Sequence, residues 1–197
     1  MLTIHHAPQS RSSRILWLLE ELGEPYAIEY MDIRRANGTG APDPRNPHPD
    51  KKVPALVHDG QLVTESAAIC LHLSDAFPKA KLGPLPGDAK RGAYLTWLAY
   101  YAGVIEPVVI AKAQGRTEKD PDEKRAYDQM ESRLRGALAA GAYVLGDAFS
   151  AADILVVSVF QWMRALMPAG KEFDEYVKRC TARPALARAT AKDGKLG

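Results

Sequence analysis

The chain has 197 residues, of which 46% are hydrophobic and 25% charged, a composition typical of a globular protein that excludes wholesale disorder. Its 26 basic and 24 acidic side chains give a net charge of +2 and are scattered, which argues against the clustered basic surface of a nucleic-acid-binding protein. The most apolar segment, residues 151–160, is too short to cross a bilayer, and the amino terminus lacks the pattern of a signal peptide. We therefore expect a cytoplasmic protein with no nucleic-acid or membrane partner.

The cysteines and the neighbouring histidines give little sign of redox or metal chemistry. Only two cysteines occur, Cys70 and Cys180, and neither belongs to a CxxC motif. We expect both to be buried, reduced thiols. His5 and His6 have no acidic or thiol partner at ligand spacing, so no metal site is expected.

The first half of the chain begins with a strand, a helix and a second strand. Residues 2–6 alternate as in a strand, and residues 12–23 place apolar side chains at i, i+3, i+4 and i+7, as on one face of a helix. Ser10 stands where it can cap this helix, and Gly23 where it can end it. Residues 26–31 alternate again. Strand, helix and strand so close together predict a βαβ crossover with a parallel pair.

The rest of this half is a loop followed by three elements. Residues 32–52 form a polar segment that contains four prolines, which favours a loop. Asp59-Gly60 is a strong signal for a hairpin turn. Two antiparallel strands and then a helix are expected at residues 53–57, 61–64 and 65–77. The stretch 78–87 is rich in proline and glycine and predicts a linker.

Beyond Asp88 the sequence predicts helices only. The helical pattern of residues 88–114 should be kinked by Pro107. Further helices are expected from about 121 to 140, from 150 to about 167, and in a short segment from Pro184. Ser150 and Asp153 form a capping box, which predicts a role in folding.

The order β-α-β, loop, β-β-α, with a proline opening the third strand, is the layout of the thioredoxin fold. In that fold the peptide bond before this proline is cis, which exposes the backbone of the preceding residue to an extended peptide ligand. Taken alone, Val53-Pro54 favours a trans bond, because only about one X-Pro bond in twenty is cis. The order of elements reverses that preference. We expect an α/β thioredoxin-like domain at 1–78, a linker at 79–87 and an all-helical domain at 88–197.

Three motifs follow one another in the order that one known family shows. Residues 52–57 are K-V-P-A-L-V, followed by D-G at 59–60 and by T-E-S-A-A-I at 64–69. They resemble the K-V-P-A-L, D-G and E-S-x-A-I of the glutathione transferase family. Residues 10–23 are similar to the first-helix region of bacterial members. Residues 150–154, S-A-A-D-I, are similar to the family's S/T-x-A-D-I. The resemblance covers both halves of the chain.

The resemblance implies that the first half binds glutathione as a co-substrate. The backbone of Val53, before Pro54, would pair with the cysteinyl unit like an added strand. At the helix start, Ser66 suits the γ-glutamyl carboxylate and Glu65 the ammonium group, while Lys52 can neutralise a carboxylate. The alternative is that Thr64, Glu65 and Ser66 only cap the helix and that Lys52 is solvated.

The glutathione thiol must become a thiolate, because an unperturbed thiol with a pKa of about 8.5 is mostly protonated near neutral pH. Ser10 can stabilise the sulfur with its hydroxyl, and by the family's pattern a serine here marks theta- and delta-like enzymes. Ser12 is the alternative, and Arg11 can add positive potential. Ser10 could also be no more than a helix cap. The absence of cysteine from residues 7–14 disfavours the mixed disulfides of glutaredoxins and cysteine-type transferases.

The electrophile site is expected between the two halves. Tyr94, Trp97 and Tyr101 follow helical spacing and are candidates for an apolar wall, although such residues are more often plain core. The resemblance implies a homodimeric detoxification enzyme that joins glutathione to small hydrophobic electrophiles. A non-catalytic glutathione-binding or regulatory relative is one alternative, motivated by Lys51, where family members usually have glycine. A glutathione-dependent peroxidase or isomerase is another.

Overall fold

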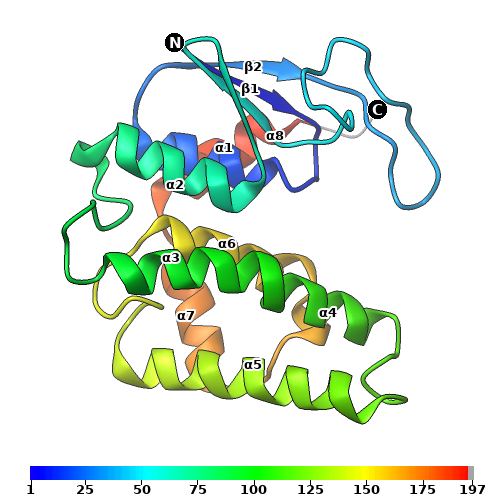
Figure 1. Cartoon of the computed structure of the whole chain (residues 1–197), viewed down its shortest axis with the longest axis vertical. Helices are drawn as coiled ribbons and strands as arrows, with labels where there is room; N and C mark the ends of the chain where they lie inside the picture. The colour runs from blue at the N-terminus through cyan, green and yellow to red at the C-terminus, as the bar shows by residue number, and fades with distance from the viewer. Residues whose placement is uncertain (195–197) are drawn as a thin grey trace. The chain divides into compact units, whose positions relative to one another are not determined.

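The computed structural model describes residues 1–194, which form two compact units. The first unit consists of residues 1–80 together with the segment that begins at Pro184, and the second of residues 81–183. The first is α/β and the second all-helical, which confirms the predicted fold class (Figure 1).

The sheet of the first unit has four strands in the order β2-β1-β3-β4. They are β1 (Leu2–His6), β2 (Tyr26–Tyr30), β3 (Ala55–His58) and β4 (Gln61–Thr64). β1 pairs with β2 in parallel, as the predicted crossover requires, and β3 is antiparallel to both β1 and β4. Asp59 and Gly60, which join β3 to β4, have φ angles of 48° and 83°. Two positive φ angles are those of a type I′ turn, so the hairpin prediction is confirmed.

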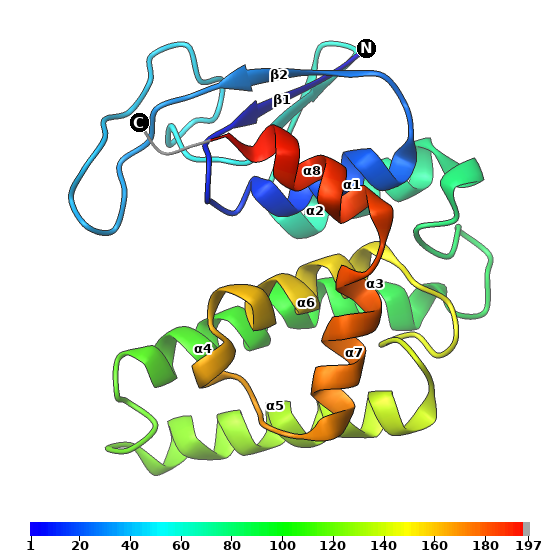
Figure 2. The same ribbon diagram turned by 180° about the vertical axis from the view of Figure 1, so that it is seen from behind.

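Three helices of the first unit lie on one face of this sheet, as both ribbon views show: α1 (Ser13–Leu22), α2 (Ser66–Ala76) and α8 (Pro184–Asp193) (Figures 1 and 2). A short 3₁₀ turn, η1 (Pro78–Ala80), follows α2. α1 ends at Gly23, whose φ of 73° lets its N–H reach the carbonyl oxygen of Leu19 at 3.2 Å. Between the helices and the sheet lie fully buried apolar side chains such as Ile4, Leu18 and Leu56.

The last helix, α8, belongs to the first unit, which differs from the expected helical domain at 88–197. It packs alongside α1 (Figure 2). Arg188 donates hydrogen bonds to the side chain and to the carbonyl oxygen of Glu20, both at 2.8 Å, and Lys192 also contacts that carboxylate. The sequence could not reveal this partner, because α8 is rich in alanine and has few large apolar side chains to mark its packing face.

The second unit is a bundle of helices and helical turns: α3 (Arg91–Tyr100), η2 (Tyr101–Ile105), α4 (Glu106–Ala113), α5 (Pro121–Ala140), α6 (Ala151–Trp162), η3 (Arg164–Leu166) and α7 (Lys171–Thr181). Every residue from 151 to 160 in α6 is buried, which explains why this stretch is apolar all round. α6 is therefore the core helix of the unit.

The kink expected at Pro107 takes the form of a π-helical turn, η2, between α3 and α4. Proline has no N–H to donate to the carbonyl group four residues before it. Just ahead of it, the N–H of Glu106 donates to the carbonyl oxygen of Tyr101, five residues back. The single helix predicted for 88–114 is thus two α-helices joined by this turn.

Helix α7 was not predicted, and α6 ends at Trp162, earlier than the expected residue 167. Phe173, Tyr176 and Cys180 form the buried side of α7. Their spacing, with acidic residues in the first turn and basic residues in the last, is a signal that could have found it.

One described stretch, Arg91–Ala113, is long and apolar enough to cross a membrane by length and composition, with a hydropathy of 1.3. Core helices of water-soluble proteins pass the same test, and Tyr94, Trp97 and Leu98 of this stretch are buried. The stretch is therefore weak evidence for a membrane span.

Candidate functional site

Three features of the first unit meet at one end of its sheet. The pairing of β1 with β3 sets His5 opposite Ala55, and the pairing of β3 with β4 sets Thr64 opposite Ala55. The residues that flank these pairs are therefore neighbours at this end: His6 before the loop to α1, Pro54 before β3, and Glu65 after β4.

The loop that follows β1 carries the two candidate serines. Ser10 is partly exposed, and its hydroxyl donates to the carbonyl oxygen of Ala7 at 2.7 Å. Its Oγ also lies 2.7 Å from the Oγ of Ser12, which is fully buried. The loop thus keeps one hydroxyl at the surface and the other inside.

The prediction that Ser10 caps the first helix is wrong. The N-cap of α1 is Ser12, and it makes no side-chain capping bond. The chain turns before the helix begins, because the N–H of Ser13 donates to the carbonyl oxygen of Ser10 at 3.0 Å. Ser10 is therefore not the N-cap of α1, although its hydroxyl oxygen accepts from the N–H of Ser12 at 3.1 Å.

The peptide bond between Val53 and Pro54 is cis, as predicted. β3 begins at Ala55, so Val53 lies just outside the strand ladder. Its side chain packs with Ala7 and Met31 in a small buried cluster. Because Ala7 also holds the Ser10 hydroxyl, this cluster brings the serine loop beside the residue that precedes the cis-proline.

A buried asparagine that the sequence analysis missed holds the chain before Val53. Asn46 is 0% exposed; its Nδ2 donates to the carbonyl oxygen of Lys52 at 2.9 Å, and its Oδ1 accepts from the N–H of His48 at 3.0 Å. Lys52 itself is exposed, with Nζ 3.4 Å from a carboxylate oxygen of Asp50. Only the position of Asn46 near the predicted edge could have signalled its role.

Lys51 keeps the backbone shape that a glycine would have. Its φ is 54°, in the left-handed region that glycine adopts without steric cost. Its Nζ donates to the carbonyl oxygen of Asn46 at 2.7 Å, which ties the side chain back to the loop. Lys51 therefore adopts a left-handed backbone conformation without being a glycine.

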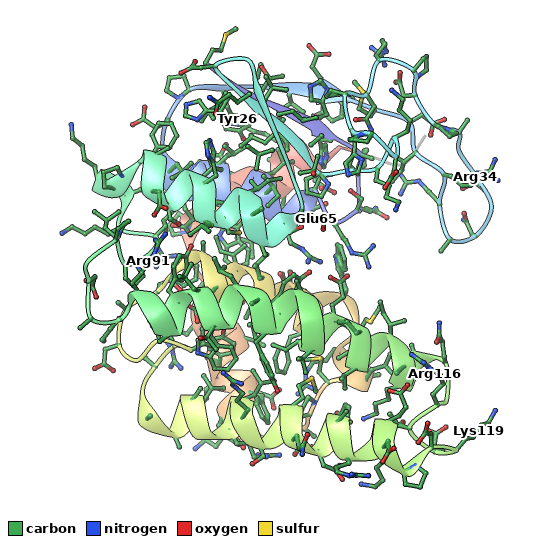
Figure 3. All side chains as sticks on the ribbon, viewed as in Figure 1. Tyr26, Arg34, Glu65, Arg91, Arg116 and Lys119 are labelled. Carbon is green, nitrogen blue, oxygen red and sulfur yellow. The ribbon has the colours of Figure 1, made fainter. Side chains whose placement is uncertain are left out.

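The start of α2 has an unusual backbone. Glu65 is exposed and has φ 66° and ψ 123°, a conformation that costs a non-glycine residue about 1–3 kcal/mol and is often found at functional sites (Figure 3). Its side chain makes no capping bond, so the capping alternative for Glu65 is wrong. Ser66, buried, is the first residue of the helix, where free N–H groups and the helix dipole favour an anion.

Two family models match the chain: the glutathione S-transferase N-terminal domain at residues 10–76 and the glutathione S-transferase C-terminal domain at residues 124–189. Together they cover about two thirds of it. The chain belongs to the glutathione S-transferase family.

Individual relatives agree with this assignment. The chain is 34% identical over 111 residues to glutathione S-transferase 3 of Schizosaccharomyces pombe, covering 56% of this chain but only 45% of that protein. It is 23% identical over 182 residues to glutathione S-transferase GstA of Escherichia coli O157:H7, covering 89% and 90% of the two chains.

Solved structures agree as well. A glutathione transferase of Methylococcus capsulatus is 27% identical with a TM-score of 0.79, covering 98% of this chain and 99% of that one. A glutathione transferase homologue from Sulfitobacter with bound glutathione is 25% identical with a TM-score of 0.74, covering 98% of each chain.

The cysteines of this family member are buried and free, as expected. Burial raises the pKa of Cys70 to about 12, although the charge of Arg14 acts against this. Burial also raises the pKa of Cys180. Because the thiolate is the reactive form, neither cysteine is suited to act as a nucleophile.

The predicted site residues of the second unit lie in packed surroundings. Tyr94, Trp97 and Tyr101 are all buried. The Tyr101 hydroxyl donates to Glu106 at 2.6 Å, and the ring of Trp97 lies edge-on to that of Tyr100 at 5.7 Å. Such packing is typical of a core, and contact with an electrophile stays a prediction.

The predicted capping box of α6 is present. One carboxylate oxygen of Asp153 accepts from the N–H and the hydroxyl of Ser150 at 2.8 and 2.9 Å. The other accepts from the N–H of Val144 and the hydroxyl of Tyr176, both at 3.0 Å. All four groups belong to the second unit, so the motif holds that unit together.

Within residues 1–194 no group of three or more histidine, cysteine, aspartate or glutamate side chains is placed to hold a metal ion.

Arg11 is exposed on the loop that carries the serines.

Proposed function

We propose that this chain is a glutathione transferase that joins the thiolate of glutathione to an electrophilic carbon of small hydrophobic compounds, forming a thioether. The observation that supports this most strongly is the meeting, at one end of the sheet, of the serine loop, the cis Val53-Pro54 bond and the start of α2 at Glu65. A thioredoxin-like edge with a hydroxyl on one side and a helix N-terminus on the other suits a small peptide with an anionic end.

The tripeptide would be held by backbone and charge. Val53, positioned by the cis bond to Pro54, would pair with the cysteinyl unit through its N–H and C=O. The N–H and hydroxyl of Ser66 would bind the γ-glutamyl carboxylate, and Glu65 its ammonium group. Lys52 would neutralise a carboxylate of the ligand. The exposed side chain of Glu65 fits this role, because it makes no capping bond with its own helix.

The sulfur would be activated by Ser10. The nucleophilic thiol must come from the ligand, since both cysteines of the chain are buried with raised pKa values. A hydroxyl hydrogen bond favours the charged thiolate and lowers its pKa, and Arg11 on the same loop adds positive potential. Ser12 is the alternative activator.

The electrophile, the assembly and the cellular setting are also part of the proposal. Tyr94, Trp97 and Tyr101 are our candidates for the electrophile side. The family resemblance favours a homodimer that acts in the cytoplasm in detoxification.

The decisive experiment measures the ultraviolet absorbance of bound glutathione thiolate against pH, together with conjugation of an aryl halide, in the wild type and in Ser10→Ala. Loss of a hydrogen bond to a charged sulfur costs about 1.5–3 kcal/mol, so we expect the thiol pKa to rise by about 1–2 units and kcat/KM at neutral pH to fall about 10–100-fold. Ser10→Thr, which keeps a hydroxyl, should keep most of the effect.

Other outcomes would redirect the proposal. An unshifted thiol pKa in the wild type would refute activation, and a lowered pKa that survives Ser10→Ala would move the role to Ser12 or to the backbone. Binding of glutathione without conjugation of any electrophile would favour a binding or regulatory protein. Turnover of hydroperoxides or unsaturated keto acids in its place would favour a peroxidase or an isomerase.

A further inference from the structure

A row of hydrogen bonds runs from the Ser10 hydroxyl into the first unit. Ser10 Oγ lies 2.7 Å from Ser12 Oγ, and Ser12 Oγ lies 2.7 Å from Nδ1 of His6. On its other side the ring of His6 contacts the last helix, with Nε2 2.9 Å from the carbonyl oxygen of Asp193. His6 and Ser12 are both fully buried, so solvent does not compete for these contacts.

The chemistry of the groups sets the direction of the hydrogen bonds that His6 makes with Asp193 and Ser12. A carbonyl oxygen can only accept, so the hydrogen of the His6 ring must be on Nε2 and point to Asp193. Burial lowers the pKa of His6, although the hydrogen bond and charge of Asp193 act against this, and the ring is therefore neutral near pH 7. Nδ1 then carries a lone pair, and the Ser12 hydroxyl must donate to it.

This direction makes the two serines unequal. The one hydroxyl hydrogen of Ser12 is used by His6, whose Nδ1 lies at 2.7 Å, closer than the Ala7 carbonyl oxygen at 3.3 Å, and the Ser12 oxygen accepts from the N–H of Ala7 at 3.1 Å. The Ser10 hydroxyl faces two neutral acceptors, the Ala7 carbonyl oxygen and Ser12 Oγ, and its own oxygen accepts from the N–H of Ser12 at 3.1 Å. A thiolate is a stronger acceptor than either neutral oxygen and would attract the Ser10 hydrogen.

We propose that His6 is a positioning residue: it commits the Ser12 hydroxyl to the interior and so leaves Ser10 as the hydroxyl that donates to the glutathione sulfur. This inference rests on the proposed function and deepens it. It also gives the last helix a part in the site, because the backbone of Asp193 holds the ring of His6 in the required tautomer.

The test compares three variants of β1 by the thiol pKa of bound glutathione. His6→Leu removes the acceptor for Ser12, and we expect the thiol pKa to rise by about one unit because the Ser10 hydroxyl is no longer held in place. His6→Asn puts an oxygen near the position of Nδ1 and should restore the wild-type value to within about 0.3 unit. His5→Leu is the matched control: it removes the neighbouring histidine, whose Nδ1 has no hydrogen-bond partner among the described residues, and should change nothing.

A measurement on the wild type tests the inference even if His6→Leu does not fold. Nitrogen-15 NMR of the His6 ring should show hydrogen on Nε2 and none on Nδ1 near pH 7. The opposite tautomer, or a doubly protonated ring, would overturn the inference. So would a thiol pKa that is lowered equally in the wild type and in folded His6→Leu, and that result would leave the proposed function standing. A wild type without a lowered thiol pKa would overturn the proposed activation and this inference together.

Discussion

Two helices of this chain begin with a serine and an acidic residue close together, and they use them in opposite ways. At the start of α6, Asp153 is 0% exposed and accepts four hydrogen bonds, two of them from Ser150. At the start of α2, Glu65 is exposed, holds a φ of 66° and makes no side-chain capping bond, and Ser66 follows it as the first helical residue.

The difference between the two helix starts distinguishes a motif that stabilises the fold from one that can bind a ligand. A capping box satisfies the helix with its own side chains and leaves little for a ligand. A helix start whose acid does not cap it keeps N–H groups and the positive end of the dipole for something else. We infer that the first motif stabilises the second unit and that the second motif serves glutathione. Each prediction below tests one side of this contrast.

The largest effect is expected at Asp153. Asp153→Asn keeps the shape but replaces one carboxylate oxygen by an NH₂ group, which must face a backbone N–H that is itself a donor, either that of Val144 or that of Ser150. We expect the second unit to lose about 3 kcal/mol of unfolding free energy, measured by urea denaturation. Ser150→Ala, which removes one of the four bonds, should cost about 1 kcal/mol. If Asp153→Asn lowers the unfolding free energy by less than about 1 kcal/mol, the capping box does not hold the fold.

At Glu65 we expect a smaller effect, on the binding of glutathione and not on stability. Glu65→Gln removes the charge proposed for the γ-glutamyl ammonium group, so the KM for glutathione should rise about tenfold, which is ~1.4 kcal/mol. The melting temperature should not fall, because this side chain makes no capping bond. If Glu65→Gln instead destabilises the protein and leaves the KM unchanged, the two helix starts do not differ in the way we infer.

The sequence was sufficient for the features that depend on local signals. The strands alternate, Asp59-Gly60 favours one turn type, and the position of Pro54 in the order of elements predicted a cis bond that the structure contains. The capping box of α6 was predicted correctly because all of its parts lie within four residues.

The features that the sequence did not predict depend on contacts between distant segments. His6 meets Ser12 only because the loop after β1 turns back, and it meets Asp193 only because α8 packs on the first unit. The backbone angles of Lys51 and Glu65 are positive although lysine and glutamate seldom adopt them, so no local preference indicates them. The network behind Ser10 was thus missed, and the roles of the predicted site residues stay predictions.

Glu20 is a third acidic residue to set beside Asp153 and Glu65, and its contacts indicate a role in folding. Burial acts to raise its pKa, but hydrogen bonds from Lys192, Tyr26 and Arg188 outweigh this and lower it from 4.5 to about 2. A lowered pKa in the folded state means that the stabilisation is complete above about pH 4.5 and is lost as the pH falls toward 2.

Glu20→Gln should therefore reduce the unfolding free energy of the first unit near pH 7 and match the wild type near pH 2. Because Arg188 and Lys192 are about half exposed, solvent screening limits the difference to about 1 kcal/mol. Urea denaturation at several pH values measures it, with Glu24→Gln, an exposed acid beyond the same helix, as the control. If Glu20→Gln is still less stable than the wild type at pH 2, the ion pairs of Glu20 do not attach α8 to α1. Packing of α8 alone would then hold the Asp193 carbonyl group against His6.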